Sequence, residues 1–447
     1  MNEQPDAEEL ARLLGGACVQ ELSRLLGGAS RQTWAFRLDG RRLVLRRDPP
    51  GAPSGVGMER EAALLRAAAR AGLAVPELIA AGPDFLVLSW VDGETLARRI
   101  LRDAAFAPAR ERLLRQCGEQ LARLHTRVPP GQVPGLVGGE PLERLRGRLD
   151  VIGEPHPAFE VGLRWLQEHR PPTQTDVVLH GDFRLGNLMV DADGLVAVLD
   201  WELAHLGEPL QDLAWLCVRS WRFGSPLPAA GIGTREELAQ AYEDAGGAPV
   251  DFDALHWWEV FCTLDWGVMC LEQSRAHLEG RVRSVELAAI GRRVCEVELD
   301  LLDLLPGGEV HPPVPAPKPG PLVELHDRPT AAELVEAVRE FAEGLPVNGH
   351  DRFLTRVSVG VLRIVERELL LGPPLAREHA DRLAALGVSN DTELAALIRS
   401  GEAQPAQVLP SVRAAVVAKL LVADPSQLID RYRAGPTRAP PSSFPAR

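Results

Sequence analysis

The N-terminal ninety residues alternate apolar and polar positions in a way that predicts a small mixed α/β lobe. Apolar residues alternate with polar or small ones from 34 to 38 and again from 43 to 45. The Asp39-Gly40 pair between these runs predicts a β-hairpin. Residues 57–71 consist mostly of helix formers, and the apolar run 85–91 predicts a buried strand. The expected order is therefore β-β-α-β.

Apolar residues at helical spacing predict that the rest of the chain is mainly helical. A proline-rich stretch with the composition of a semi-rigid spacer divides it. The expected helices cover 94–103, 108–126, 158–169, 209–221, 235–245, 251–275 and 280–304 before the spacer, and 331–343, 349–371, 375–385, 391–400 and 410–422 after it. The predicted domains are a nucleotide-binding lobe (1–91), a helical catalytic lobe (92–305), the linker (306–322) and a helical accessory domain with a disordered tail (323–447).

Composition excludes several classes of function for the 447 residues. The formal charge of −13 argues against nucleic acid as a partner, because phosphate binding needs a basic surface. The six cysteines show no CxxC spacing, so neither a disulfide framework nor a cysteine zinc site is expected. The N-terminal residues lack the features of a signal peptide, and no run of 18 apolar residues indicates a membrane span. A cytoplasmic protein is expected.

The basic residues are almost all arginines. Only Lys318 and Lys419 are lysines, so residues 1–317 contain none. Any mechanism in that part of the chain that would need a Schiff-base or phosphate-anchoring lysine must use another group.

One stretch, residues 177–216, concentrates the groups that could carry chemistry. Asp182 follows an apolar run, Asn187 comes five residues later, and a second apolar run ends at Asp200. The turn residues Asp193-Gly194 predict a hairpin in which position 187 lies opposite 200. An amide oxygen and a carboxylate at the open end of a hairpin suit a hard cation such as Mg²⁺. Asp182 would then be free to accept a proton.

The spacing of these residues resembles the catalytic and metal-binding loops of protein kinases and of the aminoglycoside phosphotransferase family. The form HGDxxxxN followed by DWE, with Pro209-x-x-Asp212 downstream, is similar to the small-molecule branch. The resemblance implies an α+β, bilobal protein-kinase-like fold, here followed by an all-helical domain. It also implies a phosphotransferase that uses ATP and Mg²⁺, with Asp182 as the catalytic base and Asn187 and Asp200 as Mg²⁺ ligands.

The resemblance extends to the first lobe, where it implies the residues that hold the nucleotide. Gly28 and Ser30 would belong to the loop over the phosphates. Arg46 stands where the family has a lysine, and Glu61 where that lysine has its ion-pair partner; Arg46 as a solvated strand-edge residue is the alternative. The backbone of Ser89 and Val91 would bond the adenine edge.

The resemblance implies an alcohol group as the phosphoryl acceptor. The sequence leaves open which molecule carries that group. The VLRRDPPG and LDWELAHLGEP segments resemble the phosphotransferase modules fused to acyl-CoA dehydrogenases, so a hydroxyacyl thioester or similar metabolite is preferred to an aminoglycoside. A pseudokinase or nucleotide-binding scaffold is the alternative, motivated by the missing lysine. A metal hydrolase is not supported, since no HExxH motif occurs.

The C-terminal part, 323–447, resembles an uncharacterised helical domain and carries no catalytic constellation. It is expected to pack on the kinase lobe or to form a homodimer. No membrane partner is expected.

Overall fold

The structure is a computed structural model that describes residues 5–16, 18–25, 31–48, 56–306 and 328–429. The chain forms two compact units. The first contains Met1–Gly139 and Pro171–Glu259, and the second contains Glu140–Arg170 and Val260–Arg447. The domain boundaries expected from the sequence stay predictions.

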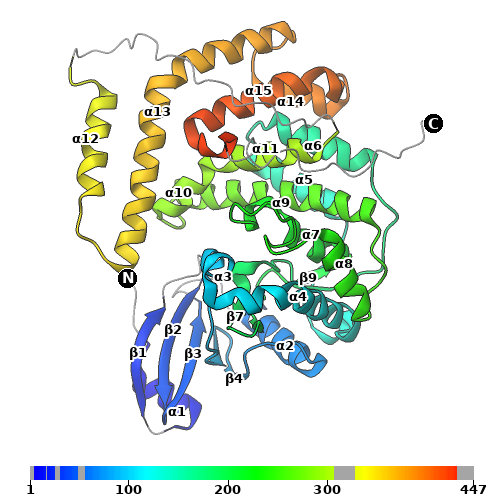
Figure 1. The fold of residues 1–447 in the computed structure, drawn as a ribbon, viewed down its shortest axis with the longest axis vertical. Coiled ribbons are helices and arrows are strands. Elements are labelled where there is room, and N and C mark those ends of the chain that lie inside the picture. The colour runs from blue at the N-terminus through cyan, green and yellow to red at the C-terminus, as the bar shows by residue number, and fades with distance from the viewer. Residues whose placement is uncertain (1–4, 17, 26–30, 49–55, 307–327, 430–447) are drawn as a thin grey trace. The chain divides into compact units, whose positions relative to one another are not determined.

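A five-stranded antiparallel sheet dominates the N-terminal part of the first unit (Figure 1). The strands are β1 (Val19–Leu25), β2 (Gln32–Leu38), β3 (Arg41–Arg47), β4 (Leu78–Ala81) and β5 (Phe85–Ser89), in the order β1-β2-β3-β5-β4. Leu38 pairs with Arg41 across Asp39 and Gly40, which have φ of 50° and 82°. The predicted hairpin is therefore confirmed, whereas β4 was not anticipated.

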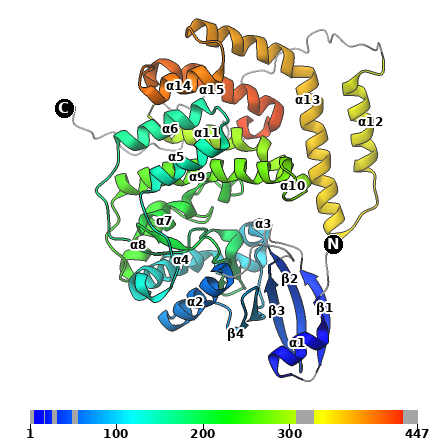
Figure 2. The same ribbon diagram turned by 180° about the vertical axis from the view of Figure 1, so that it is seen from behind.

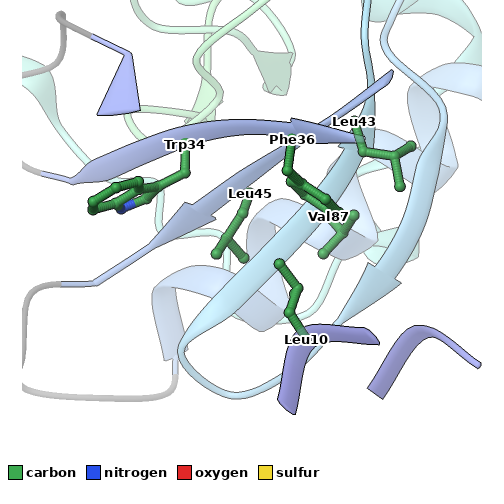
Figure 3. Packing of buried hydrophobic residues seen from close by; sticks show 6 residues of the cluster. All are labelled: Leu10, Trp34, Phe36, Leu43, Leu45 and Val87. Atoms are coloured by element: carbon green, nitrogen blue, oxygen red, sulfur yellow. The ribbon is translucent and has the colours of Figure 1, made fainter. Parts of the chain in front are cut away.

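The alternating residues of this sheet build the core of the lobe. Trp34 and Phe36 of β2 and Leu43 and Leu45 of β3 are all less than 10% exposed. They meet Val87 of β5 and Leu10 of α1 (Ala7–Leu14), as Figure 3 shows. Alternation places these side chains on one face of the sheet, where their burial stabilises the lobe.

The remainder of the first unit is mostly helical. Its helices are α2 (Val56–Ala71), α3 (Ala97–Arg102), α4 (Ala107–Arg127), α7 (Leu210–Cys217), α8 (Arg235–Asp244) and the beginning of α9 (Phe252–Leu278). Two small antiparallel pairs join β6 (Val177–Leu179) to β9 (His205–Gly207) and β7 (Leu188–Val190) to β8 (Leu195–Val198).

All regular elements in the described part of the second unit are helices. They are α5 (Pro141–Ile152), α6 (Pro157–Glu168), the rest of α9, α10 (Val285–Arg292), α11 (Val294–Leu304), α12 (Ala331–Glu343), α13 (Gly349–Ala385), α14 (Asp391–Ser400) and α15 (Pro405–Ala423). The bounds of α12 and α14 are those predicted, while α5 was missed.

Two predicted helices, 349–371 and 375–385, form the single helix α13, so the predicted break was wrong. Pro373 and Pro374 lie inside it. Proline removes backbone donors and kinks a helix without always ending it. The helix axis bends part-way along its length in Figures 1 and 2.

Among the described residues, α15 is the single helix that is long and apolar enough to cross a membrane. A single such helix is weak evidence. Val408, Val412, Val416 and Leu420 of α15 are buried within the second unit.

Candidate active site

A loop between β6 and β7 presents Asp182. The chain leaves β6 at Leu179 and passes through Gly181, whose φ is 79°. A Cβ on Gly181 would lie 2.3 Å from the Leu203 carbonyl oxygen, so both the conformation and the close approach require glycine. Asp182 follows and is only 9% exposed.

Three side-chain donors hold the Asp182 carboxylate. Asn187 Nδ2 donates to Oδ2 at 2.6 Å, while Arg184 Nε and Trp215 Nε1 donate to Oδ1 at 2.8 and 2.9 Å. Because Asn187 uses its amide nitrogen here, its Oδ1 is turned away from Asp182 as an acceptor. The arrangement fixes the direction of the carboxylate and places it beside a guanidinium.

Asp212 on α7 braces the loop from behind. Its carboxylate accepts hydrogen bonds from the backbone amides of His180 (2.8 Å) and Gly181 (2.9 Å) and from His125 Nε2 (3.2 Å). His125 Nδ1 lies 2.9 Å from the Tyr242 hydroxyl. Burial by itself would raise the pKa of Asp212, but the hydrogen bond and charge of His125 outweigh it and lower that pKa. The buried carboxylate therefore stays ionised and anchors the loop.

His180 connects this loop to the segment that precedes Asp200. The Asp182 amide donates to His180 Nδ1 at 3.2 Å, so Nε2 carries the proton. Nε2 lies 3.0 Å from the Leu199 carbonyl oxygen, to which it donates. His180 therefore holds the loop that carries Asp182 and the segment that precedes Asp200 in fixed positions relative to each other.

The register of the β7–β8 hairpin differs from the prediction. Leu188 pairs with Val198 and the Leu199 amide bonds the Asn187 carbonyl at 2.8 Å, so position 187 lies opposite 199 rather than 200. The turn itself closes two residues away from the predicted register, because Val190 pairs with Leu195 instead of position 197, and the irregularity between Met189 and Val190 shifts the outer pairs back by one. A bulge of this kind shifts every later pair along the ribbon.

Asp200 lies just beyond β8 and turns toward the first lobe. Its φ of 64° is left-handed, which is uncommon for a residue other than glycine. Its Oδ1 accepts from Arg46 Nη2 at 2.8 Å, and Arg46 Nη1 donates to Glu61 Oε1 at 2.5 Å. Burial would lower the pKa of Arg46, but Glu61 and Asp200 outweigh it and raise that pKa. Arg46 is therefore a held cation and not a solvated strand-edge residue.

A second arginine shares Glu61. Arg31 Nη1 donates to Glu61 Oε2, and Arg31 Nε donates to Asp48 at 3.2 Å. Glu61 is 1% exposed, and the guanidinium groups of Arg46 and Arg31 occupy both of its oxygens. Arg31 stands at the entry to β2, directly after the glycine-containing segment of the sequence.

The remaining predicted nucleotide residues are placed in part. Gly28 and Ser30 lie outside the described residues. The Ser89 amide donates to the Glu77 carbonyl at 2.9 Å, and Ser89 Oγ accepts from the Glu77 amide at 2.9 Å. The backbone amide of Val91 makes no hydrogen bond to other described residues, and its role toward a nucleotide stays a prediction.

The structure brings the predicted residues together in two groups. Asp182 and Asn187 are hydrogen-bonded to each other, and Arg46 joins Glu61 to Asp200. Within the described part of the chain, Asn187 and Asp200 share no hydrogen bond, and no three His, Cys, Asp or Glu side chains form a metal cluster. An Mg²⁺ bound with nucleotide phosphates needs only one or two protein carboxylates, so the pair Asn187 and Asp200 still suits it.

Sequence reasoning missed Arg184, Trp215 and Arg31. The signals were present, because Arg184 lies inside the HGDFRLGN motif and Trp215 lies three residues after Asp212. What the sequence lacks is the direction of each side chain.

Comparison with known proteins identifies the family. The model of the "Phosphotransferase enzyme family" matches residues 21–258, which are more than half of the chain and include all of the candidate site residues. The chain belongs to this family. Its class of reaction is that of a kinase, the transfer of a phosphoryl group to an alcohol group of a small molecule.

Curated relatives match the same region. Acyl-CoA dehydrogenase family member 10 of Mus musculus is 30% identical over 260 residues, which are 50% of this chain and 23% of that protein. Acyl-CoA dehydrogenase family member 11 of Gallus gallus is 31% identical over 209 residues, 42% of this chain and 26% of that protein. The chain thus spans about a quarter of the length of these relatives.

A solved structure shows the fold. A Ralstonia eutropha protein studied as a candidate aminoglycoside phosphotransferase superposes with a TM-score of 0.51 at 24% identity, over 65% of this chain and 94% of that one. The predicted kinase-like fold, with its small antiparallel sheet, helical remainder and C-terminal helices, is confirmed. Residues 346–427 match a further model, "Domain of unknown function (DUF6285)".

Proposed function

We propose that this phosphotransferase moves the γ-phosphoryl group of ATP to a hydroxyl group of a small metabolite, with Asp182 as the base for the hydroxyl proton. The observation that carries the proposal is the buried Asp182 carboxylate, held by Asn187, Arg184 and Trp215. A fixed carboxylate can orient an acceptor hydroxyl and take its proton as the new P–O bond forms.

Arg46 takes the place of the usual phosphate-binding lysine in this proposal. It is fixed by Glu61 and Asp200, and arginine binds phosphate oxygens through paired N–H groups. Arg31 supports the same carboxylate from the other side. Asn187 Oδ1 and Asp200 would hold Mg²⁺, which would neutralise charge on the nucleotide phosphates.

The surroundings of Arg184 support an acceptor that carries a negative group. Its guanidinium bonds Asp182 through Nε and lies 4.8 Å from the centre of the Trp221 ring. The side chain is 28% exposed and pairs with no second carboxylate of the described residues. Its remaining N–H groups could bind a carboxylate or phosphate beside the reacting hydroxyl. A polycationic aminoglycoside would meet a like charge there, so we prefer a hydroxyacyl thioester or similar anionic metabolite.

The cysteines support a reducing, cytoplasmic setting. All six are free thiols, and five of them are buried. Burial raises the pKa of Cys117 to about 12, which keeps that thiol protonated.

A pseudokinase is the second candidate, and the absence of lysine from residues 1–317 is the observation that favours it. The two candidates differ in turnover and not in nucleotide binding.

Purified full-length chain is incubated with Mg²⁺, ATP and a panel of hydroxyacyl thioesters and aminoglycosides, with ADP release and product mass as readouts. We expect a thioester to stimulate ADP release, Asp182→Asn to abolish the stimulation while nucleotide still binds, and Asp193→Asn to behave as wild type. Asp193 is a matched control, because its side chain is 88% exposed in the nearby hairpin turn. Nucleotide binding without turnover on any acceptor would support the pseudokinase, and full activity of Asp182→Asn would refute Asp182 as the base.

A further inference from the structure

A cleft opens inside the second unit, where residues of α13, α14 and α15 meet residues of α10 and α11. Its volume is about 350 Å³, which lies in the range of small-molecule sites, roughly 300–1,000 Å³. At about 30 Å³ for a group of the size of water, roughly ten non-hydrogen atoms fit into it. Three of the five helices belong to the region that matches the domain of unknown function.

Most of the cleft wall is apolar. Helix α15 contributes Ala415, Ala418 and Val422, whose spacing of three and four residues places them on one side of the helix. Val294 of α11 and Leu375 of α13 line the cleft as well. The two alanines leave space that larger side chains would fill, so the packing of these helices keeps the cleft open.

The carboxylates of the cleft already have basic partners. Within the described part of the chain, the pairs are Glu298 with His156 and Lys419, Asp391 with His379, and Glu368 with Arg292. A cationic ligand would therefore have to break one of these pairs before it found a carboxylate.

The groups that lack partners at the polar end of the cleft are donors on cations. Lys419 Nζ carries three N–H groups and is 3.3 Å from Glu298, its one printed acceptor among the described residues, while its side chain is 41% exposed. Arg382 Nε and Nη2 are buried without a hydrogen-bond partner in the described chain, and Nη1 lies 3.9 Å from Glu378. Nε and Nη2 form one edge of the guanidinium, and such an edge binds a carboxylate through two parallel hydrogen bonds.

A small void connects Arg382 with the cleft. The void has a volume of about 10 Å³, close to what one water-sized group needs. Arg382 lines it, and Lys419, His379 and Asp391 line both the void and the cleft. The two spaces therefore form one site with an apolar body and a polar end, and the polar end has room for an oxygen atom.

We propose that this site binds a small amphipathic acid, with its alkyl chain in the cleft and its carboxylate at Lys419 and Arg382. The apolar walls favour the chain, because its burial removes apolar surface from water. The unpaired donors favour a carboxylate over an amine, which would meet Lys419 and Arg382 as like charges. The proposal assigns ligand binding to the domain of unknown function and does not depend on the phosphotransferase reaction.

Isothermal titration calorimetry of the full chain with sodium octanoate, kept below its micelle concentration, tests the site. We expect one octanoate per chain, bound about tenfold or more tightly than 1-octanol, which has the same chain without the carboxylate. Ala418→Phe should abolish binding by filling the cleft, and Arg382→Gln should weaken it by about tenfold or more. Arg377→Gln is the matched control that should bind as wild type, because Arg377 is exposed on the same helix and does not line the cleft.

Urea unfolding without octanoate separates a binding role of Arg382 from a structural one. Because Nε and Nη2 have no partner in the ligand-free chain, Arg382→Gln should leave the urea midpoint unchanged or raise it. Where Ala418→Phe does not fold, as judged by far-UV circular dichroism, Ala418→Leu takes its place and should weaken octanoate binding.

Three results would overturn the proposal. The first is a chain that does not bind octanoate, and the second is equal binding of 1-octanol. The third is octanoate binding that survives the Ala418 variants or Arg382→Gln, which would place the acid elsewhere or leave the void to a buried water.

Discussion

Arg46, at the position where the resemblance implies a lysine, is held by two carboxylates. Its two Nη groups bridge Glu61 and Asp200, which a single ammonium nitrogen cannot do with the same geometry. Arg31 occupies the second oxygen of Glu61, so Arg46 rests on a carboxylate that is fixed from two sides. The planar fork, and not only its charge, is what this site uses.

We therefore expect Arg46→Ala to raise the KM for ATP by about 10- to 100-fold, the loss of one or two charge-assisted hydrogen bonds. Arg46→Lys should fall between alanine and wild type, because it keeps the charge but loses the bridge. Steady-state kinetics at varied ATP measure both. Arg41→Lys, on the exposed end of the same strand, is the control that should change nothing.

Asp212 makes the stability of the loop depend on pH. Its pKa is lowered in the folded chain, so its ionised form stabilises the fold above the unfolded-state pKa of about 3.9, and this contribution is lost as the pH falls through the lowered pKa. Asp212→Asn should cost about 2 kcal/mol of unfolding free energy at pH 7. Urea unfolding at pH 7, 5 and 3 should show the variant and wild type converging only at the most acidic pH. A difference that is constant down to pH 3 would contradict this account.

At the scale of elements, the β7–β8 hairpin is held in register by a helix that neither strand adjoins in sequence. Gln116 Oε1 of α4 accepts the Leu195 amide at 2.9 Å. Gly194 has a φ of 135°, and a Cβ there would lie 2.2 Å from the same Gln116 oxygen. The turn that aims Asp200 is therefore fixed by contact with α4 as well as by its own residues.

Gly194→Ala should destabilise the protein by about 1–3 kcal/mol, through backbone strain and the clash with Gln116. Gly147→Ala is a matched control of opposite sign. Gly147 lies in helix α5 with no atom near its Cβ position, so alanine there should stabilise by about 0.5–1 kcal/mol. Urea midpoints compare the two, and equal effects would show that the turn is not constrained as described.

At the scale of the whole molecule, the C-terminal helices belong to the packing of the second unit. Glu298 on α11 is 1% exposed in its side chain and accepts from His156 Nδ1 at 2.8 Å and from Lys419 Nζ of α15 at 3.3 Å. Burial would raise the pKa of Glu298, but Lys419 and His156 lower it. Arg413 of α15 pairs with Asp303 of α11 at 2.8 Å. These contacts join helices that the sequence separates by a proline-rich stretch.

Removing the lysine tests how much the buried Glu298 depends on its partly exposed partner. Lys419→Met is expected to destabilise the chain by about 1–2 kcal/mol, because it leaves a buried carboxylate with less compensation, while solvent screens part of the effect. Lys419→Met combined with Glu298→Gln should recover part of the loss. Urea unfolding measures both, with Arg377→Ala as an exposed control. An unchanged midpoint for Lys419→Met would mean that Glu298 is adequately held by His156 alone.

The residues that the sequence predicted correctly are those whose structure depends on near neighbours. The Asp39-Gly40 hairpin and the bounds of α12 and α14 follow from turn chemistry and helical spacing. The HGDxxxxN motif likewise indicated which side chains to examine, since Asp182 and Asn187 lie on one short loop.

Other features depend on contacts that a local pattern does not contain. The sequence determined the motif, the absence of lysine from residues 1–317 and most helices, because composition and periodicity are local properties. The tertiary structure decided that α13 continues through Pro373 and Pro374, that Asn187 pairs with Leu199, and that Trp215 and Arg184 hold Asp182. A register, a kink and the aim of a side chain are set by what packs against them, and those partners lie far away along the chain.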